Sequence, residues 1–221
     1  GKRAPHLLPR VRWLDHLPEH FDGLVLANEV LDAMPAHLVS WNGATIAERG
    51  VAVKDGQFIW SDRPANGRLL ERARVLAAEC AIAPGYLSEI ALLAPAWVAQ
   101  WAAILGHGAL LLIDYGFPRR EYYHPQRIGG TLMCHRQHRA DADPLVDVGR
   151  KDITAHVNFT GIALAGQDAG TKVVLSHEHP FYRAGDPFLL GRAHDNGGHG
   201  VHGGHPLLRR VHPRGDPGRE G

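Results

Sequence analysis

Three polar side chains, Asn28, Glu29 and Asp32, follow closely on a short apolar run at residues 24–27. A run of this kind predicts a parallel β-strand at about residues 21–28, buried on both faces. Ligands of open α/β sheets bind outside the carboxyl ends of such strands, which is where these side chains fall. Their acceptor and proton-accepting groups make this segment a candidate catalytic or binding site. Asp32 could equally cap the following turn, and Glu29 could be a solvated strand end.

A second apolar run, at residues 109–113, also turns polar at its carboxyl end, with Asp114 and Tyr115. A right-handed crossover would lay the two strands parallel and bring both carboxyl ends to one edge of the sheet. We therefore expect Asp32 and Asp114 to face one cleft. The alternative is that Asp114 and Tyr115 only make hydrogen bonds at the end of their strand.

A third set of polar groups, His135 and His138, lies in a long segment without clear periodicity. These histidines could orient a substrate or carry a proton, or they could be ordinary polar loop residues. Together with Cys134 they suggest zinc, but no second pair of ligands has the spacing of a zinc site. We therefore predict no bound metal.

The elements that must position these groups follow from hydrophobic periodicity and from turn residues. The Asn-Gly pair at 42–43 and the Asp-Gly pair at 55–56 indicate tight hairpins, which predicts an antiparallel β-meander inserted at residues 36–62. We expect the meander to be a cap or lid without a catalytic role. The other expected segments are strands at 11–14 and 171–175, helices at 68–78, from Pro95 to Gly106, and at 159–169, and a long loop at 117–158.

Composition narrows the class of protein. The 24 Lys and Arg residues against 23 Asp and Glu give a formal net charge of +1 at pH 7, so we expect no general attraction to nucleic acid or anionic membranes. No apolar run approaches the roughly 20 residues of a membrane-spanning helix. Two distant cysteines, Cys80 and Cys134, favour a reducing compartment over a disulfide framework. The segment 176–221 is rich in His, Gly and Arg and is predicted to be disordered.

Four segments together resemble a known family. They are ANEVLDAMP at 27–35, SEI at 88–90, GALLLIDYGFPRREYYHPQRIGGTLMCH at 108–135 and DITAHVNF at 152–159. Their order and spacing are similar to those of the MidA-type methyltransferases, which are bacterial and mitochondrial enzymes that use S-adenosylmethionine (SAM). The match covers roughly residues 11–170 and is more specific than any single short motif.

The resemblance implies an α/β fold, a partial class I (Rossmann-like) methyltransferase sheet within residues 1–175, with the strands at 11–14, 21–28, 109–113 and 171–175 as third to sixth. It implies SAM as the cofactor and an arginine-bearing protein as the substrate, because the mitochondrial member is implicated in respiratory complex I assembly through dimethylation of a subunit arginine. The expected compartment is the cytoplasm of a bacterium, or the mitochondrial matrix of a eukaryote.

The resemblance also implies roles for particular residues. Carboxylates pair bidentately with a planar guanidinium, so Glu29 and Asp32 would position the arginine and help to expose a lone pair. Asn28 would contact the cofactor or the nucleophile. Trp13 and Asp15 would lie beside the adenine, although they could instead be a core aromatic and a turn cap.

The substrate cleft would then be lined by Asp114, Tyr115, His135 and His138.

The chain departs from the family pattern in informative places. No glycine-rich SAM loop precedes residue 21, so we expect a fragment that is inactive alone. Arg136-Gln137 and Asn158 replace an expected Tyr-Arg-like pair and an Asp, and the segment from about 170 onward does not match. Loss of two strands would expose a sheet edge, which predicts poor folding or a homo-oligomer. The rival hypothesis is a non-catalytic binding or assembly module that keeps the substrate cleft.

Overall fold

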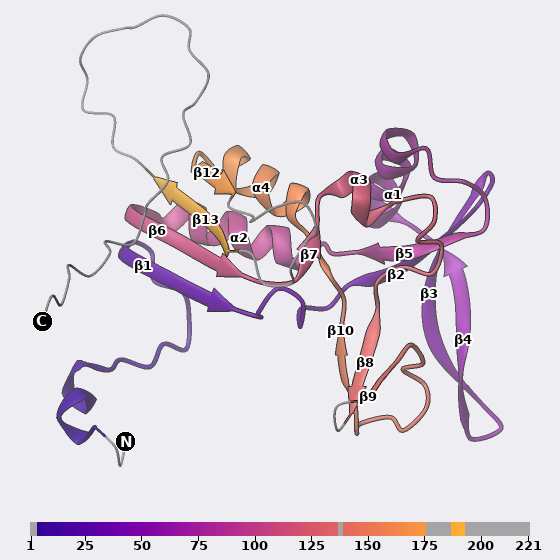
Figure 1. Cartoon of the computed structure of the whole chain (residues 1–221), viewed down its shortest axis with the longest axis horizontal. Helices are drawn as coiled ribbons and strands as arrows, with labels where there is room; N and C mark the ends of the chain where they lie inside the picture. The colour runs from indigo at the N-terminus through magenta and orange to yellow at the C-terminus, as the bar shows by residue number, and fades with distance from the viewer. Residues whose placement is uncertain (1–3, 137–138, 176–186, 193–221) are drawn as a thin grey trace, which may run out of the picture.

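The computed structural model describes residues 4–136, 139–175 and 187–192 of the 221-residue chain (Figure 1). It is a mixed α/β structure, and no helix in these ranges is long and apolar enough to cross a membrane. The first half of the chain contains η1 (Pro5–Arg10), β1 (Phe21–Asn28), β2 (His37–Asn42), β3 (Thr45–Lys54), β4 (Gln57–Pro64), α1 (Gly67–Cys80), β5 (Tyr86–Ile90) and α2 (Leu93–Ile104). The second half contains β6 (Leu105–Ile113), β7 (Gly116–Phe117), α3 (Arg119–Tyr122), β8 (Met133–Arg136), β9 (Arg139–Asp141), β10 (Asp152–Thr154), β11 (Val157–Asn158), α4 (Phe159–Asp168), β12 (Lys172–Leu175) and β13 (Pro187–Arg192).

The sheet that carries the predicted site has the strand order β1-β6-β13-β12. Strands β1 and β6 run parallel, as expected, while β13 is antiparallel to both β6 and β12. Helices α2 and α4 cover one face of this sheet (Figure 1). Leu110 and Leu112 of β6 are fully buried against Val98 of α2 and Ile162 of α4, which forms one hydrophobic core.

Strand β1 is confirmed, but the expectation that both its faces are buried is wrong. Leu24 and Leu26 are 60% and 62% exposed, whereas Ala27 is buried and Val25 is partly buried against the core. The physical reason is that α2 and α4 cover only one face and that β1 is an edge strand among the described residues. A strand with one covered face alternates in burial along its length.

The glycines after α2 act in a strand and not as a helix cap. The helix ends at Ile104, earlier than the expected stop at Gly106, and Leu105 already begins β6. A Cβ at Gly108, where φ is +147°, would overlap the backbone carbonyl of Gly23. The glycines therefore let β6 approach β1 closely at the start of their pairing.

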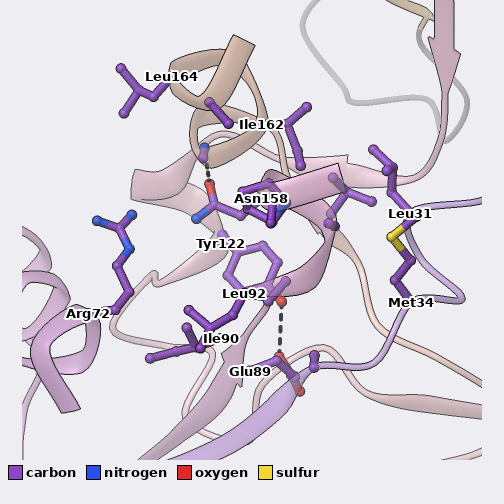
Figure 2. A pocket seen from close by; sticks show the side chains of 18 of the residues that line it. Leu31, Met34, Arg72, Glu89, Ile90, Leu92, Tyr122, Asn158, Ile162 and Leu164 are labelled. Atoms are coloured by element: carbon purple, nitrogen blue, oxygen red, sulfur yellow. Dashed lines mark hydrogen bonds between the residues drawn. The ribbon is translucent and has the colours of Figure 1, made fainter. Parts of the chain in front are cut away.

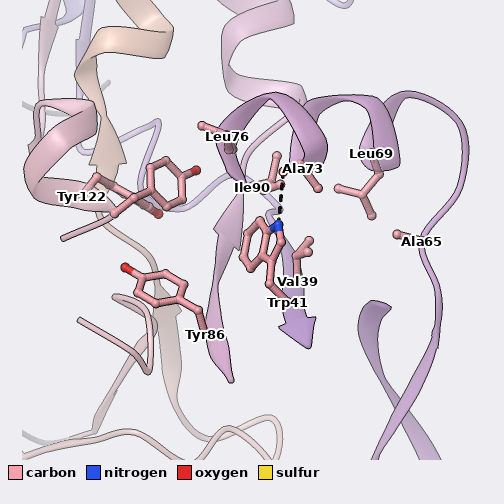
Figure 3. Packing of buried hydrophobic residues seen from close by; sticks show 10 residues of the cluster. Val39, Trp41, Ala65, Leu69, Ala73, Leu76, Tyr86, Ile90 and Tyr122 are labelled. Carbon is pink, nitrogen blue, oxygen red and sulfur yellow. Dashed lines mark hydrogen bonds between the residues drawn. The ribbon is translucent and has the colours of Figure 1, made fainter. Parts of the chain in front are cut away.

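The expected β-meander is confirmed and gains a fourth strand, in the order β4-β3-β2-β5. Helix α1 packs on this sheet and forms a second hydrophobic core (Figure 3). At its centre the Trp41 indole donates to the Ala73 carbonyl at 3.1 Å and meets Tyr86 edge to face at 6.1 Å between centroids. Packing of an amphipathic helix explains why α1 forms where its periodicity predicts it.

The expected long loop at 117–158 contains short elements that periodicity did not show. Helix α3 follows Pro118, β8 pairs with both β9 and β10, and β11 pairs with β7. Strands of two to four residues are too short to show an alternating pattern, so only their tertiary pairing reveals them. Helix α4 and strand β12 appear close to the predicted positions, and the side chain of Asn158 accepts from the Gly161 N–H to cap α4.

Two further expectations about the ends of the described chain are wrong. Residues 11–14 form no strand and are exposed, because nothing in the described part of the chain pairs with them. The segment 176–221 was predicted to be disordered throughout, yet β13 forms at Pro187–Arg192 and joins the sheet between β6 and β12. The rest of that segment lies outside the described residues.

Candidate functional site

The carboxyl ends of β1 and β6 lie side by side, as the sequence predicts. Asn28 at the end of β1 is the register partner of Ile113 at the end of β6. The pairing continues one step further, because the Glu29 N–H donates to the Ile113 carbonyl at 2.8 Å. Glu29 and Asp114 therefore both begin at one edge of the sheet, which is where α/β sheets bind ligands.

Asp114 fastens the segment after β1 to the end of β6. Its side chain is 2% exposed, and its Oδ2 atom accepts from the backbone N–H of Leu31 at 2.8 Å and of Asp32 at 3.3 Å. Burial raises the pKa of Asp114 to about 6, and the nearby charge of Asp32 adds to the rise. Backbone donors, including the Tyr115 N–H, act in the opposite direction. Asp114 thus positions Asp32 through these hydrogen bonds and also contributes a carboxylate to this edge of the sheet.

Asp32 has a carboxylate oxygen that the described residues leave without a partner. Its Oδ1 atom is buried and accepts no hydrogen bond. Burial is the main reason that the pKa of Asp32 is raised, and the charges of Glu29 and Asp152 add to the rise. A backbone hydrogen bond from Ala33 to the carboxylate acts in the opposite direction. A buried acceptor without a donor costs free energy, so this atom is suited to receive an N–H from a ligand.

Glu29 is the third carboxylate at this edge of the sheet. Its backbone has a φ of 49°, in the left-handed region that residues other than glycine seldom adopt. The Tyr115 hydroxyl is hydrogen-bonded to the Glu29 side chain, and this bond raises the pKa of Tyr115. Within the described ranges no Lys, Arg or His forms an ion pair with Glu29, Asp32 or Asp114. We call Glu29, Asp32, Asp114 and Tyr115 the acidic edge.

A buried carboxylate on β5, Glu89, holds the neighbouring loop in place. It is 1% exposed and accepts from the backbone N–H groups of Thr131 and Leu132, each at 2.9 Å. The Tyr122 hydroxyl donates to the same carboxylate at 3.2 Å. Gly130, with a φ of +77°, lies so close that a Cβ there would overlap Glu89. The Glu89 carboxylate therefore fixes the path of the chain into β8.

This loop is connected by hydrogen bonds to the acidic edge. The Thr131 hydroxyl accepts from the backbone N–H of His156 at 3.1 Å, and the preceding backbone N–H, of Ala155, donates to the Asp32 carbonyl at 3.2 Å. The His156 ring stacks on Phe117 with 4.9 Å between centroids, and burial lowers the pKa of His156. Glu89 is thus linked to Asp32 through two segments far apart in sequence.

Glu89 and His156 are absent from the candidate residues chosen from the sequence. Both lie in segments that carry the family resemblance, but neither has a spacing that marks it as functional. The available signal is an acid next to Ser88 in an otherwise apolar strand, Tyr86–Ile90. A carboxylate in a strand that is covered on both faces must have hydrogen-bond partners inside the protein.

The remaining candidates stay apart from the acidic edge. Asn28 is exposed at the end of β1, adjacent to the edge in the chain. Trp13 is 89% exposed and Asp15 is exposed, so the reading of Trp13 as a core aromatic is wrong. His135 is exposed on β8 and makes no hydrogen bond with the acidic edge, while His138 lies outside the described residues.

The acceptors of the acidic edge suit a cationic ligand more than a metal ion. In the described part of the chain no three His, Cys, Asp or Glu side chains come close enough together to hold a metal. Glu29 is exposed and close enough to Asp32 for its charge to act on that carboxylate, whose Oδ1 atom is free. These two groups can accept hydrogen bonds from a ligand at the strand ends. A sulfonium or a guanidinium has the charge that this arrangement lacks.

Comparisons with known proteins find a matching family and similar solved structures. Residues 1–176 match the model of a family described as "putative S-adenosyl-L-methionine-dependent methyltransferase". A Burkholderia thailandensis structure, described as "a COG1565 superfamily member and likely methyl transferase" bound to S-adenosylhomocysteine, is 50% identical with a TM-score of 0.71. The match covers 79% of this chain and 45% of that one.

A native structure from the same organism, described as an uncharacterized protein of the same superfamily, is also 50% identical, with a TM-score of 0.72 over 79% of this chain and 46% of that one. The chain therefore spans less than half the length of these solved structures. Comparison with curated proteins gives no match. The family match over 176 residues shows that the chain belongs to this family of S-adenosyl-L-methionine-dependent methyltransferases.

Proposed function

We propose that the chain carries the substrate-binding part of a class I, Rossmann-like methyltransferase that methylates an arginine of a protein. The observation that carries this proposal is the buried Oδ1 atom of Asp32, which lacks a hydrogen-bond partner among the described residues. It lies beside Glu29 and Asp114, which have no cationic partner there either. A guanidinium supplies both positive charge and a planar set of N–H donors, which fits such a group of acceptors.

The residues of the acidic edge would share the work of the reaction. When bound, SAM supplies the methyl group on a positively charged sulfur. Glu29 and Asp32 would hold the guanidinium so that one nitrogen faces that methyl group. Methylation of this nitrogen releases one proton, which Asp32 can accept at Oδ1 because its pKa is raised. Asp114 would keep Asp32 in place through the backbone bonds of Leu31 and Asp32.

The finer parts of the proposal have different support. The parallel pair β1 and β6, followed by β12 in the same sheet, is compatible with the fourth, fifth and sixth strands of a class I sheet. The arginine substrate, a respiratory complex I subunit as partner, and a bacterial cytoplasmic or mitochondrial location are supported by the resemblance to MidA-type enzymes. The exposed edge of β1 supports association into a homo-oligomer.

The test is methyl transfer measured with radiolabelled SAM. The 221-residue chain and a version extended upstream are each incubated with a peptide that contains one Arg and with the same peptide in which Lys replaces that Arg. We expect only the extended version to label the peptide, only when Arg is present, and mass spectrometry to find methylarginine. Calorimetry with SAM on both proteins separates loss of cofactor binding from loss of chemistry.

Two results would overturn the proposal. Label on Lys, or on a small molecule and not on protein, would remove the arginine assignment. SAM binding without any methyl transfer by the extended protein would favour a binding or assembly module. Glu29→Gln serves as an internal check, because it should weaken peptide binding while SAM binding stays within about twofold.

A further inference from the structure

A cavity of about 530 Å³ lies next to the acidic edge without including it (Figure 2). Its wall is built by α1, β5, α2, α3, α4 and the segment after β1, and it contains none of Glu29, Asp32, Asp114 and Tyr115. Pockets that bind small molecules commonly measure roughly 300–1,000 Å³ and have mostly apolar walls. The size of this cavity is therefore that of a small-molecule site.

The walls of the cavity are largely apolar. Arg72 lies at one end in Figure 2, and Leu31 and Met34 lie at the other. The larger apolar side chains of the wall are Leu31, Met34, Ile90, Leu92, Ile162 and Leu164. A ligand that fills this space must have an apolar body, since polar atoms there would lose their water.

Most polar groups of the wall already have partners within the protein. The Tyr122 hydroxyl donates to the Glu89 carboxylate (Figure 2). The Tyr123 hydroxyl donates to the Glu89 backbone carbonyl at 3.0 Å. Asn158 is occupied in capping α4. Burial lowers the pKa of His156, which leaves its ring neutral near pH 7. Tyr122, Tyr123, Asn158 and His156 therefore supply no charge to a ligand, and the Glu89 carboxylate accepts hydrogen bonds from the protein's own N–H and O–H groups.

Arg72 is different from these groups. It is half-buried on α1, and no carboxylate lies within 4.0 Å of it among the described residues. Arg68 lies one turn earlier on the same face of α1 and also lines the cavity. The acid without an internal partner in the wall is Asp168, which comes from the last turn of α4. An anion is thus attracted to the α1 end of the cavity.

We propose that this cavity binds a small carboxylic acid with an apolar body, whose carboxylate pairs with Arg72 and whose chain lies along Ile90 and Ile162. A guanidinium pairs bidentately with a carboxylate, and such charge-assisted bonds are stronger where water is partly excluded. The proposal does not depend on methyl transfer, because binding to the cavity requires no group of the acidic edge. Its ligand would also contact Leu31, the neighbour of Asp32.

Calorimetry on the 221-residue chain tests the proposal with octanoate as the probe and octan-1-ol as its uncharged analogue. We expect octanoate to bind at least tenfold more tightly than octan-1-ol. Arg72→Gln should remove that advantage, since it deletes the charge. Arg74→Gln is the matched control, because Arg74 is exposed on the same helix and does not line the cavity, and it should bind as the wild type does.

A space-filling variant locates the binding. Ala99→Trp, in the wall from α2, should abolish octanoate binding while the circular dichroism spectrum stays unchanged. If this variant fails to fold, Ala165→Phe fills the cavity from α4 instead. The proposal is overturned if wild type fails to bind octanoate, if octan-1-ol binds as tightly, or if Arg72→Gln and Arg74→Gln bind octanoate equally well.

Discussion

Acidic side chains have opposite environments in the meander and at the acidic edge. In the meander, Glu48 is hydrogen-bonded to both His37 and Arg63, and these partners lower its pKa. At the acidic edge, burial raises the pKa of Asp32 and of Asp114, and the charge of Asp32 adds to the rise at Asp114. The meander pairs its acids with cations, whereas the acidic edge brings several acids close together.

The pairing of strands explains the neutral region. Glu48 and Arg63 are directly opposite each other on β3 and β4, and so are Arg49 and Asp62, whose bond measures 2.8 Å. Opposite charges on facing positions stabilise a sheet modestly. Among the described residues no such pairing serves the acidic edge, which costs folding free energy. The comparison teaches that the meander pairs its acids with cations inside the protein, whereas the acidic edge leaves its acids without a cationic partner among the described residues.

The largest expected effect on stability lies in the meander. Trp41 is 3% exposed in the second core, so Trp41→Ala leaves a cavity and removes the indole hydrogen bond to the Ala73 carbonyl. We expect a loss of about 3–5 kcal/mol in the free energy of unfolding, measured with urea. Trp60→Ala, at a position 37% exposed on β4, is the matched control and should cost less than about 1 kcal/mol. Equal losses would mean that this core does not stabilise the fold.

The largest expected effect on chemistry lies at the acidic edge. Asp32→Asn removes the charge and the proton acceptor, so methyl transfer by the extended protein should fall at least about a hundredfold, or about 2.7 kcal/mol. The free energy of unfolding should stay equal or rise, because an uncompensated acid is lost. Asp62→Asn, which breaks a meander ion pair, should leave the rate unchanged. Loss of activity in both variants would point to a general structural effect.

Much of this contrast could be predicted from the sequence. The strand ends that carry Glu29, Asp32 and Asp114 follow from two apolar runs and the handedness of a crossover. The hairpins of the meander follow from two turn signals, at Asn42 and Asp55. In each case the local residues determine the geometry, so no tertiary information is needed.

The features that could not be predicted from the sequence depend on contacts between distant segments. Whether Leu24 is buried depends on which face of β1 the helices cover, and the sequence of the strand does not contain this information. Glu89 acquires its role from a loop 42 residues away. The free oxygen of Asp32 is visible only when its whole surroundings are placed. Short pairings such as β8 with β10 have too few residues to show a period.

The pH dependence of stability is the next test of the contrast. Because the pKa of Asp114 is raised from 3.8 to about 6, the folded chain keeps a proton that the unfolded chain has already released. This group therefore lowers the free energy of unfolding by roughly 1–3 kcal/mol as the pH rises from about 4 to about 6. Urea unfolding of wild type and Asp114→Asn across this range should show the difference. A constant difference between the two proteins would contradict the assigned burial.

Glu48 should show the opposite sign with a smaller size. Its pKa is lowered below 4.5, so its contribution is present above that value and is lost as the pH falls through the folded pKa. Glu48→Gln should cost up to about 1 kcal/mol at about pH 7 and nothing in acid, because the pair with Arg63 is partly exposed. Glu71→Gln on α1, at an exposed position without an ion pair among the described residues, should have no effect at either pH. If the Glu48 and Asp114 differences changed with pH in the same direction, the two regions would not differ in how they treat their acids.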